Sequence, residues 1–404
     1  MNAIPTRLVI KNGNLLHLED GRISKNQTIY IESDHISKIQ PSFENGEGAQ
    51  IIDASDKYVI PGLINSHAHS FMEPYTWDRM SRLEDGIVKI SVEVSKNLQK
   101  MLHSGITTCR EMGSIDNIDI EFRELIKDKI FDGPDLICAG RPITPTSGHC
   151  WWFGVECTGV EEVRKAVREA VKKGSDFIKI MPTGGYMRTK MKVNHSIMKD
   201  SLTMRMDEIH AAVEEAHWLG LKVSAHCNGY TGVAACVEAG VDIIDHGQFA
   251  VIDRDIQLKT LEKMAHQGTW LVPTMSAYFK EFDQEIIETK YQAVIDSFRM
   301  AVESGVSIVL GNDSGVPWVG HDKIYLELKH MSSYGMTNLQ ALQSATLQPA
   351  KMLELEEEIG SIYPGKKANL LILDRNPLED IGALESGFMV IKDGSVFDGI
   401  PNQS

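Results

Sequence analysis

Residues 58–70 read YVIPGLINSHAHS, an apolar run that ends in two histidines one residue apart. In an extended strand, alternate side chains point to the same face, so His67 and His69 are expected to converge on one point. Two converging imidazoles either pack at a surface or bind a metal ion. The rest of the chain decides between surface packing and metal binding.

Seven further apolar runs follow, separated by turns and amphipathic helical patterns. They are ITTCREMG (106–113), DLICAGRPI (135–143), DFIKIMP (176–182), LKVSAHC (221–227), VDIIDHG (241–247), TWLVPT (269–274) and VSIVLGND (306–313). Apolar strands that alternate with helices indicate a parallel sheet that is buried on both faces. Eight such units predict an α/β fold of the (β/α)₈ barrel type, in which the active site lies at the carboxyl ends of the strands.

The two ends of the chain have a different pattern. Short β-rich pieces with tight turns fill residues 5–60, and ANLLILDRNPLEDI (368–381) and GFMVIKDGSVFDG (387–399) repeat that style. Strand patterns of this kind, bounded by turn residues such as Asn12-Gly13, predict antiparallel hairpins. We therefore expect one small sheet domain built from both termini.

Composition argues against several classes of protein. A formal net charge of -15 argues against a general binder of nucleic acid or of an anionic membrane, which would need a basic face. The first residues lack the basic region and apolar core of a signal peptide, and no stretch approaches the roughly 20 apolar residues of a membrane span. The 6 cysteines are scattered without a CxxC pair. They predict reduced thiols and a cytoplasmic protein.

Ionisable residues fall at the expected carboxyl ends of the barrel strands. They are His67 and His69 after the first run, Lys179 in the fourth, His226 in the fifth, His246 in the sixth and Asp313 in the eighth. Alone, a strand histidine would be a structural residue and a strand-end aspartate a helix cap. Together they form a nitrogen and oxygen ligand set that suits Zn²⁺ or a similar divalent ion.

Lys179 introduces an ammonium group into an apolar strand, where desolvation is costly. One explanation is that its long side chain reaches out of the barrel mouth to solvent. The alternative is that the neutral amine captures carbon dioxide and becomes a carbamate. A carbamate is a long-armed carboxylate, and two nearby metal ions would favour the anion strongly.

The motifs PGLINSHAHS, IKIMPTGG, AHCNG, DHG and GNDSG together resemble those of the amidohydrolase superfamily, in its binuclear, carboxylated-lysine type. Residues 344–381 are similar to the C-terminal signature of the imidazolonepropionase-like and metal-dependent dipeptidase branch, which includes Xaa-Pro dipeptidases. The resemblance covers essentially the whole chain. It implies a (β/α)₈ TIM barrel over residues 61–357 and a small β-sandwich domain made of residues 1–60 and 358–404.

The resemblance also implies two divalent metal ions, with Zn²⁺ as the expected ion. The more buried ion would be bound by His67, His69 and Asp313, and the more exposed one by His226 and His246. Carboxylated Lys179 and a hydroxide would bridge the two ions. Asn65 stands where relatives often have aspartate, which weakens one outer partner of this site.

We expect the bridging hydroxide to attack an amide carbonyl whose oxygen is bound by the exposed ion. Asp313 would act as general base and then as general acid. His149, in TSGHCWWFG, would hydrogen-bond the carbonyl oxygen or the substrate, or else cap its loop. Tyr230, Tyr186 and Arg188 are candidate substrate contacts, although packing or a solvated loop explains them as well.

The expected activity is hydrolysis of a C–N amide or peptide bond in a small substrate. The expected substrate is a dipeptide or an N-acyl amino acid, and Xaa-Pro dipeptides are one example. One alternative is a deaminase or a cyclic-amide hydrolase of the same superfamily, but Cys227-Asn228-Gly229-Tyr230 lacks the glutamate that deaminases carry after strand five. A non-catalytic assembly protein on this fold is a further alternative. We expect a homo-oligomer that binds neither nucleic acid nor membrane.

Overall fold

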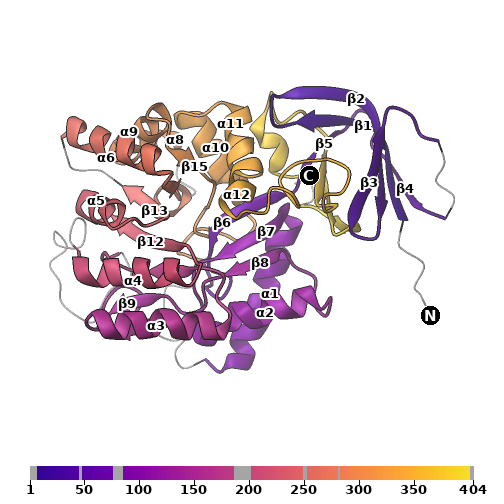
Figure 1. The fold of residues 1–404 in the computed structure, drawn as a ribbon. Coiled ribbons are helices and arrows are strands. Elements are labelled where there is room, and N and C mark those ends of the chain that lie inside the picture. Colours follow the sequence, from indigo (N-terminus) through magenta and orange to yellow (C-terminus); the bar gives the residue numbers. More distant parts are fainter. Residues whose placement is uncertain are drawn as a thin grey trace. The chain divides into compact units, whose positions relative to one another are not determined.

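The computed structural model describes residues 7–44, 48–75, 85–185, 202–248, 253–280 and 283–400 (Figure 1). The chain divides into two compact units. Unit 1 consists of Met1–Asn65, Leu98–Thr108 and His321–Ser404, and unit 2 consists of Ser66–Asn97 and Cys109–Gly320. The domain bounds given above remain a prediction.

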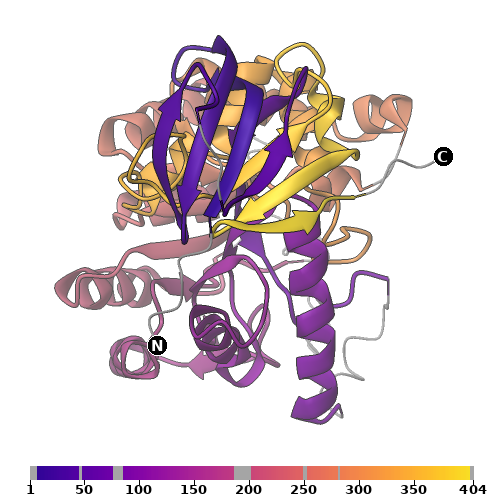
Figure 2. The ribbon, with the colours of Figure 1, turned by 90° about the vertical axis from the view of Figure 1, so that its right-hand side faces the viewer.

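Unit 1 contains a sheet built from both ends of the sequence. Its strands are β1 (Arg7–His17), β2 (Arg22–Glu32), β3 (His35–Gln40), β4 (Gln50–Asp53), β5 (Tyr58–Pro61), β16 (Leu370–Leu373), β17 (Phe388–Lys392) and β18 (Ser395–Asp398). Their order is β18-β17-β16-β5-β1-β2-β3, and β4 also pairs with β1. Figure 2 shows the indigo strands of the N-terminal part beside the yellow strands of the C-terminal part. The predicted β-rich part is confirmed.

Alternation of apolar residues gives this sheet its core. Ile29 and Ile31 of β2, and Leu370 and Ile372 of β16, are buried in one hydrophobic cluster. Residues two apart in a strand share a face, so each pair points to the same side of the sheet. Unit 1 also contains helices α10 (Ile324–Tyr334), α11 (Asn338–Ser344) and α12 (Leu347–Met352), and the 3₁₀ turn η3 (Ile381–Leu384).

Eight strands alternate with helices along the middle of the chain, as the eight apolar runs predict. The strands are β6 (Leu63–Ala68), β7 (Ile106–Glu111), β8 (Asp135–Cys138), β11 (Ile178–Ile180), β12 (Val223–Asn228), β13 (Ile243–Gln248), β14 (Trp270–Val272) and β15 (Ser307–Ile308). The helices between them are α1 (Ile87–His103), α2 (Ile118–Lys127), α3 (Val160–Lys173), α4 (Met206–Trp218), α5 (Tyr230–Glu238), α6 (Arg254–Gln267), α7 (Ser276–Phe279), α8 (Gln284–Lys290) and α9 (Gln292–Glu303). In Figure 1, α4 and α5 lie beside β12 and β13.

The barrel strands form two hydrogen-bonded sheets. One has the order β6-β7-β8, and the other has the order β10-β9-β11-β12-β13-β14-β15 with all its pairs parallel. The extra strands β9 (Ile143–Pro145) and β10 (Val155–Cys157) have three residues each, too few to recognise from sequence. The α/β architecture of parallel strands and helices is therefore confirmed, although the described strands do not form one continuous closed ladder.

Single backbone hydrogen bonds join the two sheets where the ladder is interrupted. Ser66 N donates to Leu310 O at 2.9 Å, and Asp313 N donates to His67 O at 2.9 Å. On the other side, Asp176 N donates to Cys138 O at 2.8 Å. The gap between β15 and β6 is therefore bridged by the segments that carry His67 and Asp313.

The run YVIPGLINSHAH is two strands in the structure, where the sequence predicted one. Strand β5 ends at Pro61 and belongs to the sheet of unit 1, whereas β6 begins at Leu63. A Cβ on Gly62 would lie 2.3 Å from Thr107 Oγ1, so the close approach of these segments requires glycine there. Within the described ranges, no helix combines the length and apolarity needed to cross a membrane.

Candidate metal centre

The six predicted metal ligands are all buried and all lie in unit 2. His67 is in β6 and His69 is one residue past its end. Lys179 is the central residue of β11, His226 lies in β12, His246 lies in β13, and Asp313 follows β15. Four of these elements are barrel strands and the fifth position follows a barrel strand, so the barrel gathers residues that are far apart in sequence.

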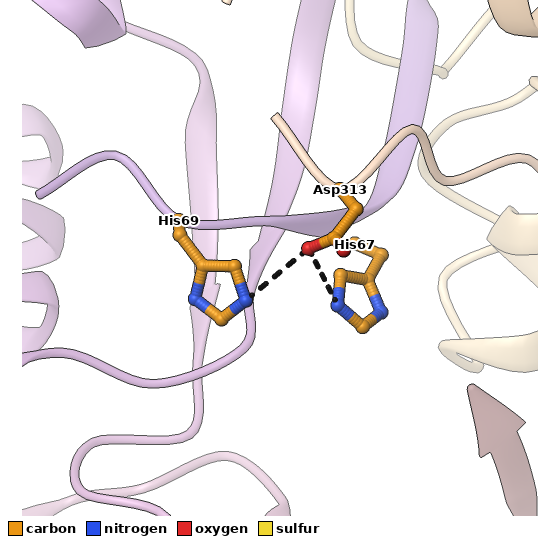
Figure 3. A group of neighbouring side chains, drawn as sticks. All are labelled: His67, His69 and Asp313. Atoms are coloured by element: carbon orange, nitrogen blue, oxygen red, sulfur yellow. Dashed lines mark ion pairs between the residues drawn. The ribbon is translucent and has the colours of Figure 1, made fainter. Parts of the chain in front are cut away.

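His67, His69 and Asp313 form a compact group (Figure 3). One ligand atom from each lies within 4.8 Å of the other two. Nε2 of His67 is 3.3 Å from Asp313 Oδ1, and Nε2 of His69 is 3.4 Å from the same oxygen. Two imidazole nitrogens and a carboxylate oxygen are donors that Zn²⁺ and similar ions prefer. This group could therefore hold a metal ion.

His226 and His246 form a second pair beside this group. Their ring centroids are 4.6 Å apart, and the centroid of His246 is 5.0 Å from that of His67. The four histidines are therefore contiguous, with His246 next to a member of the first group. Such an arrangement offers donors for two neighbouring cations.

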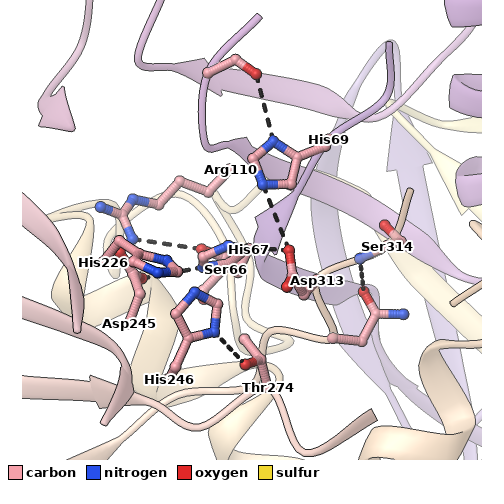
Figure 4. Close-up of polar contacts among 12 residues, drawn as sticks. Ser66, His67, His69, Arg110, His226, Asp245, His246, Thr274, Asp313 and Ser314 are labelled. Carbon is pink, nitrogen blue, oxygen red and sulfur yellow. Dashed lines mark hydrogen bonds and ion pairs between the residues drawn. The ribbon is translucent and has the colours of Figure 1, made fainter. Parts of the chain in front are cut away.

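The rings of His67, His69 and His246 are each held by a partner at Nδ1 (Figure 4). These partners are Asp245 Oδ1 for His67 at 3.1 Å, Gly113 O for His69 at 3.4 Å and Thr274 Oγ1 for His246 at 2.7 Å. Histidines that bind metals usually have such an outer partner, which fixes the ring and its tautomer. In all three rings, Nε2 is the nitrogen that remains for a metal ion.

His226 is held at the opposite ring nitrogen. Its Nε2 lies 3.3 Å from Gly184 O and 3.0 Å from Asn228 Nδ2. The amide of Asn228 is fixed in turn, because Tyr278 Oη donates to Asn228 Oδ1 at 2.9 Å. When Nε2 of His226 and Nδ2 of Asn228 both donate to the carbonyl of Gly184, His226 presents Nδ1 to a metal ion.

Burial keeps most of these imidazoles neutral, which is the form that binds metals. It lowers the pKa of His246 to about 3, lowers the pKa of His226 well below its usual value, and lowers the pKa of His69. Burial also acts to lower the pKa of His67, but the charges of Asp245 and Asp313 outweigh it and raise the pKa. His67 thus lies between two carboxylates.

The amine of Lys179 does not reach solvent, so the explanation that it extends out of the barrel mouth is wrong. Its side chain is 1% exposed and forms a short ion pair with Asp245. Ser224 Oγ also donates to Asp245, at 2.6 Å. Burial alone would raise the pKa of Asp245, but the charges of Lys179 and His67 hold it well below its usual value.

Asp245 is a residue of the centre that the sequence analysis missed, although the sequence contained a signal for it. It stands inside the apolar run VDIIDHG, which is the same kind of signal that singled out Lys179 in DFIKIMP. A charged residue in a strand buried on both faces needs a partner of opposite charge. Lys179 and Asp245, the charged residues inside these two apolar runs, are partners of each other.

Arg110 is a second missed residue. It is buried in β7, its guanidinium lies 4.0 Å from the ring centroid of Phe177, and Nη1 donates to Ser66 O at 3.4 Å. Burial lowers its pKa to about 10, which leaves the group charged near neutral pH, and the charge of Asp245 acts in the opposite direction. The buried carboxylate of Asp245 therefore faces two cations, Lys179 and Arg110.

His149 lies between β9 and β10 and stacks on His226, with ring centroids 4.2 Å apart. A Cβ on Gly185 would lie 2.4 Å from His149 Cε1, so the glycine allows this close approach. Tyr230 is the first residue of α5 and is half-buried. Tyr186 and Arg188 lie outside the described residues.

A small cavity adjoins His246. Its lining is mostly apolar, with Leu271, Pro273, Met275, Val294 and Phe298 beside the polar residues Gln248 and Ser297. A space of this size holds about one water molecule and no amino-acid side chain.

The amidohydrolase family matches residues 58–396 of the chain. The chain belongs to the amidohydrolase family. A solved structure of a Xaa-Pro dipeptidase with bound methionine is 30% identical with a TM-score of 0.83, over 98% of this chain and 100% of that one. Ochratoxinase of Aspergillus niger is 27% identical over 84% of this chain and 76% of its own length.

A more distant relative has a different activity. It is the 5-methylthioadenosine/S-adenosylhomocysteine deaminase of Caldanaerobacter subterraneus, 22% identical over 91% of this chain and 85% of its own length. The predicted resemblance to amidohydrolases is confirmed. This amidohydrolase is therefore a hydrolase of a family that generally uses divalent metal ions and acts on small molecules.

Proposed function

We propose that this amidohydrolase uses two divalent metal ions, with Zn²⁺ as the expected ion, to hydrolyse a C–N amide or peptide bond in a small substrate. Dipeptides of the Xaa-Pro kind and N-acyl amino acids are the substrates that we favour. The observation that carries the proposal is the contact between two donor groups, one of His67, His69 and Asp313 and the other of His226 and His246.

The donor chemistry fits two ions. His67, His69 and Asp313 would hold the first ion, and His226 and His246 the second, while Lys179 in its carboxylated form would bridge them. Two bound cations would polarise a carbonyl and lower the pKa of a water molecule. The outer partners of the four rings support this assignment, because each leaves one nitrogen for a metal.

Asp313 would move the proton in this reaction. Burial acts to raise its pKa, but the neighbouring His67 and His69 hold the pKa well below its usual value, so the group is an ionised carboxylate. It would take the proton of the attacking water and pass it to the leaving nitrogen. His149, stacked on His226, would donate a hydrogen bond to the substrate carbonyl or carboxylate.

The comparison with solved structures supports the substrate class. The similar Xaa-Pro dipeptidase carries its substrate in its name and matches 98% of this chain. Tyr230 at the start of α5 is proposed as a further substrate contact, as are Tyr186 and Arg188.

A deaminase or cyclic-amide hydrolase is the second candidate, and the deaminase relative favours it. The residues after His226 argue against a deaminase, because the third position is Gly229 and the second is Asn228, which is hydrogen-bonded to Tyr278. No carboxylate follows at the spacing that a deaminase would use for proton transfer. A non-catalytic role is disfavoured because the donor set is complete.

The test combines metal analysis with a substrate screen. Purified protein should contain close to two divalent ions per chain, measured by elemental analysis. It should also release free amino acid from members of a library of dipeptides, N-acyl amino acids and lactams. One ion at full occupancy, together with ammonia release from aminopurines and no peptide cleavage, would establish the deaminase instead.

A further inference from the structure

Residues 273–279, which run from the end of β14 through α7, contain no predicted metal ligand but support one histidine of the second pair directly and the other through Asn228. Thr274 Oγ1 lies 2.7 Å from His246 Nδ1 (Figure 4). Tyr278 Oη donates to Asn228 Oδ1 at 2.9 Å, and Asn228 Nδ2 donates at 3.3 Å to Gly184 O, the carbonyl that also lies 3.3 Å from His226 Nε2. One short segment therefore supports two rings that come from different strands.

The segment is internally hydrogen-bonded. Thr274 O accepts from Ala277 N at 3.1 Å, and Met275 O accepts from Tyr278 N at 3.0 Å and from Phe279 N at 2.9 Å. Thr274 is fully buried and Tyr278 is 6% exposed. One helical turn holds both Thr274 and Tyr278. A displacement of this turn would therefore disturb the supports of His246 and His226 together.

The backbone of Thr274 is in an unfavourable conformation. Its φ is 48°, in the left-handed region that a β-branched residue rarely adopts. His246, its partner, has φ 69°. Strain of this kind costs on the order of 1–3 kcal/mol and persists where the surroundings enforce it, often at functional sites. Here it is associated with the contact between the Thr274 hydroxyl and the imidazole of His246.

We propose that residues 273–279 position His226 and His246 for the second metal ion, with Thr274 and Tyr278 as the positioning residues. The inference rests on the two-ion site of the proposed function. With Nδ1 of His246 donating to Thr274, the ring presents Nε2, while Asn228 and Gly184 keep His226 in the orientation that presents Nδ1. His67 and His69 have their own partners, outside this segment.

The expected result is therefore a selective loss of the second ion. Metal-free protein is titrated with Zn²⁺ in competition with a chromophoric chelator, which gives two dissociation constants. In Thr274→Val, the weaker constant should rise by about 10- to 100-fold, the range seen when an outer partner is lost, while the tighter one stays unchanged. Tyr278→Phe should act in the same direction.

Three further substitutions separate positioning from general destabilisation. Thr274→Ser keeps the hydroxyl and should bind the second ion nearly as well as wild type. Thr274→Gly removes the backbone strain and the hydroxyl together, so it should fold well and still lose affinity for the second ion. Thr269→Val, in the same part of the chain, should leave both constants unchanged.

The outcomes distinguish this inference from the proposed function. Wild type with two ions, and unchanged constants in Thr274→Val, Thr274→Gly and Tyr278→Phe, would overturn the inference alone. Equal weakening of both ions in these variants would also overturn it, because that result indicates a structural role. Wild type that binds a single ion would overturn the inference together with the two-ion function.

Discussion

Lys179 and Asp245 are the two residues whose chemistry decides what kind of centre this is. In the structure, the lysine is an amine paired with a buried carboxylate. A carbamate on the same nitrogen would carry a negative charge and could not remain paired with Asp245. Binding of two cations would therefore have to accompany the change from ion pair to carbamate, because only they supply enough positive charge nearby.

Lys179→Ala should abolish hydrolysis, because the bridging group of the proposed site is lost. A small carboxylate such as acetate or propionate should restore part of the activity by occupying the vacated position. The measurement is the rate of dipeptide cleavage with and without added carboxylate. Lys173→Ala, at the exposed end of α3, is the matched control. Unchanged turnover in Lys179→Ala would refute a bridging role.

Asp245→Asn should destabilise the metal-free protein by about 3–5 kcal/mol, because the substitution leaves a buried ammonium without its partner. The measurement is urea-induced unfolding after chelation. Combining it with Lys179→Met should recover most of the loss, since the buried ammonium is then removed as well. Ser224→Ala, which removes one hydrogen bond to the Asp245 carboxylate, should cost about 2 kcal/mol. A loss of that size in Asp245→Asn would contradict the ion-pair interpretation.

At the scale of residues, the sequence pointed to the proposed metal ligands but not to the residues that contact them. His67, His69, His226, His246 and Asp313 could be found because a polar residue at the end of an apolar run is conspicuous. Thr274 and Asn228 could not, since a threonine or asparagine after a strand is common and its role depends on which ring lies within reach. The sequence also could not predict where the amine of Lys179 points, because its partner Asp245 comes from another strand.

At the scale of elements, the barrel strands were predictable because most of their residues are buried and each strand lies in a run that is rich in apolar residues. The split of the first run at Gly62 was not predictable, because both pieces are apolar and only the close approach of Thr107 separates them. The short strands β9 and β10 depend on pairing with their neighbours rather than on any local pattern.

The end of β7 gives a pH-dependent prediction. Burial raises the pKa of Glu111 from 4.5 to about 8. The hydrogen bond that its carboxylate accepts from the N–H of Ser70 acts to lower this pKa. Between these values the folded chain holds a proton that the unfolded chain has released. The free energy of unfolding should therefore fall as pH rises from 4.5 to 8, by about 1.4 kcal/mol per pH unit, and then level off.

Glu111→Gln keeps an acceptor for Ser70 but cannot ionise, so this slope should disappear. The variant should consequently be more stable than wild type at pH 8 and differ less at pH 5. Urea unfolding across this range measures the difference, with the exposed Glu121→Gln on α2 as the control. Parallel stability curves for wild type and Glu111→Gln would contradict the prediction.

At the scale of the whole molecule, the metal centre coincides with an interruption in the barrel ladder. The gap between β15 and β6 is bridged by the hydrogen bond from Asp313 N to His67 O, and both residues are proposed ligands of the first ion. An ion bound by both side chains would join the two segments directly. Any ligand that binds only the folded state also stabilises it.

Chelation of the metal should therefore lower the melting temperature. It should also open the hydrogen bonds across the gap between β15 and β6 before those of the rest of the barrel. In hydrogen exchange followed by mass spectrometry, the amides of Ser66 and Asp313 should exchange faster in metal-free protein. The amide of Asp176, which bridges the opposite interruption to Cys138, is the internal control and should change less. Restored protection after adding Zn²⁺ completes the test, and equal exchange with and without metal would contradict it.

The pairing of β5 with β16 has a consequence for biosynthesis. Tyr58 lies opposite Leu373 and Pro61 opposite Leu370, so the two halves of one sheet leave the ribosome far apart in time. At about 5–20 residues per second, β5 waits roughly 15–60 s for its neighbour. During that interval its apolar edge is open to other nascent chains, which makes this strand the place where a chaperone would be most useful.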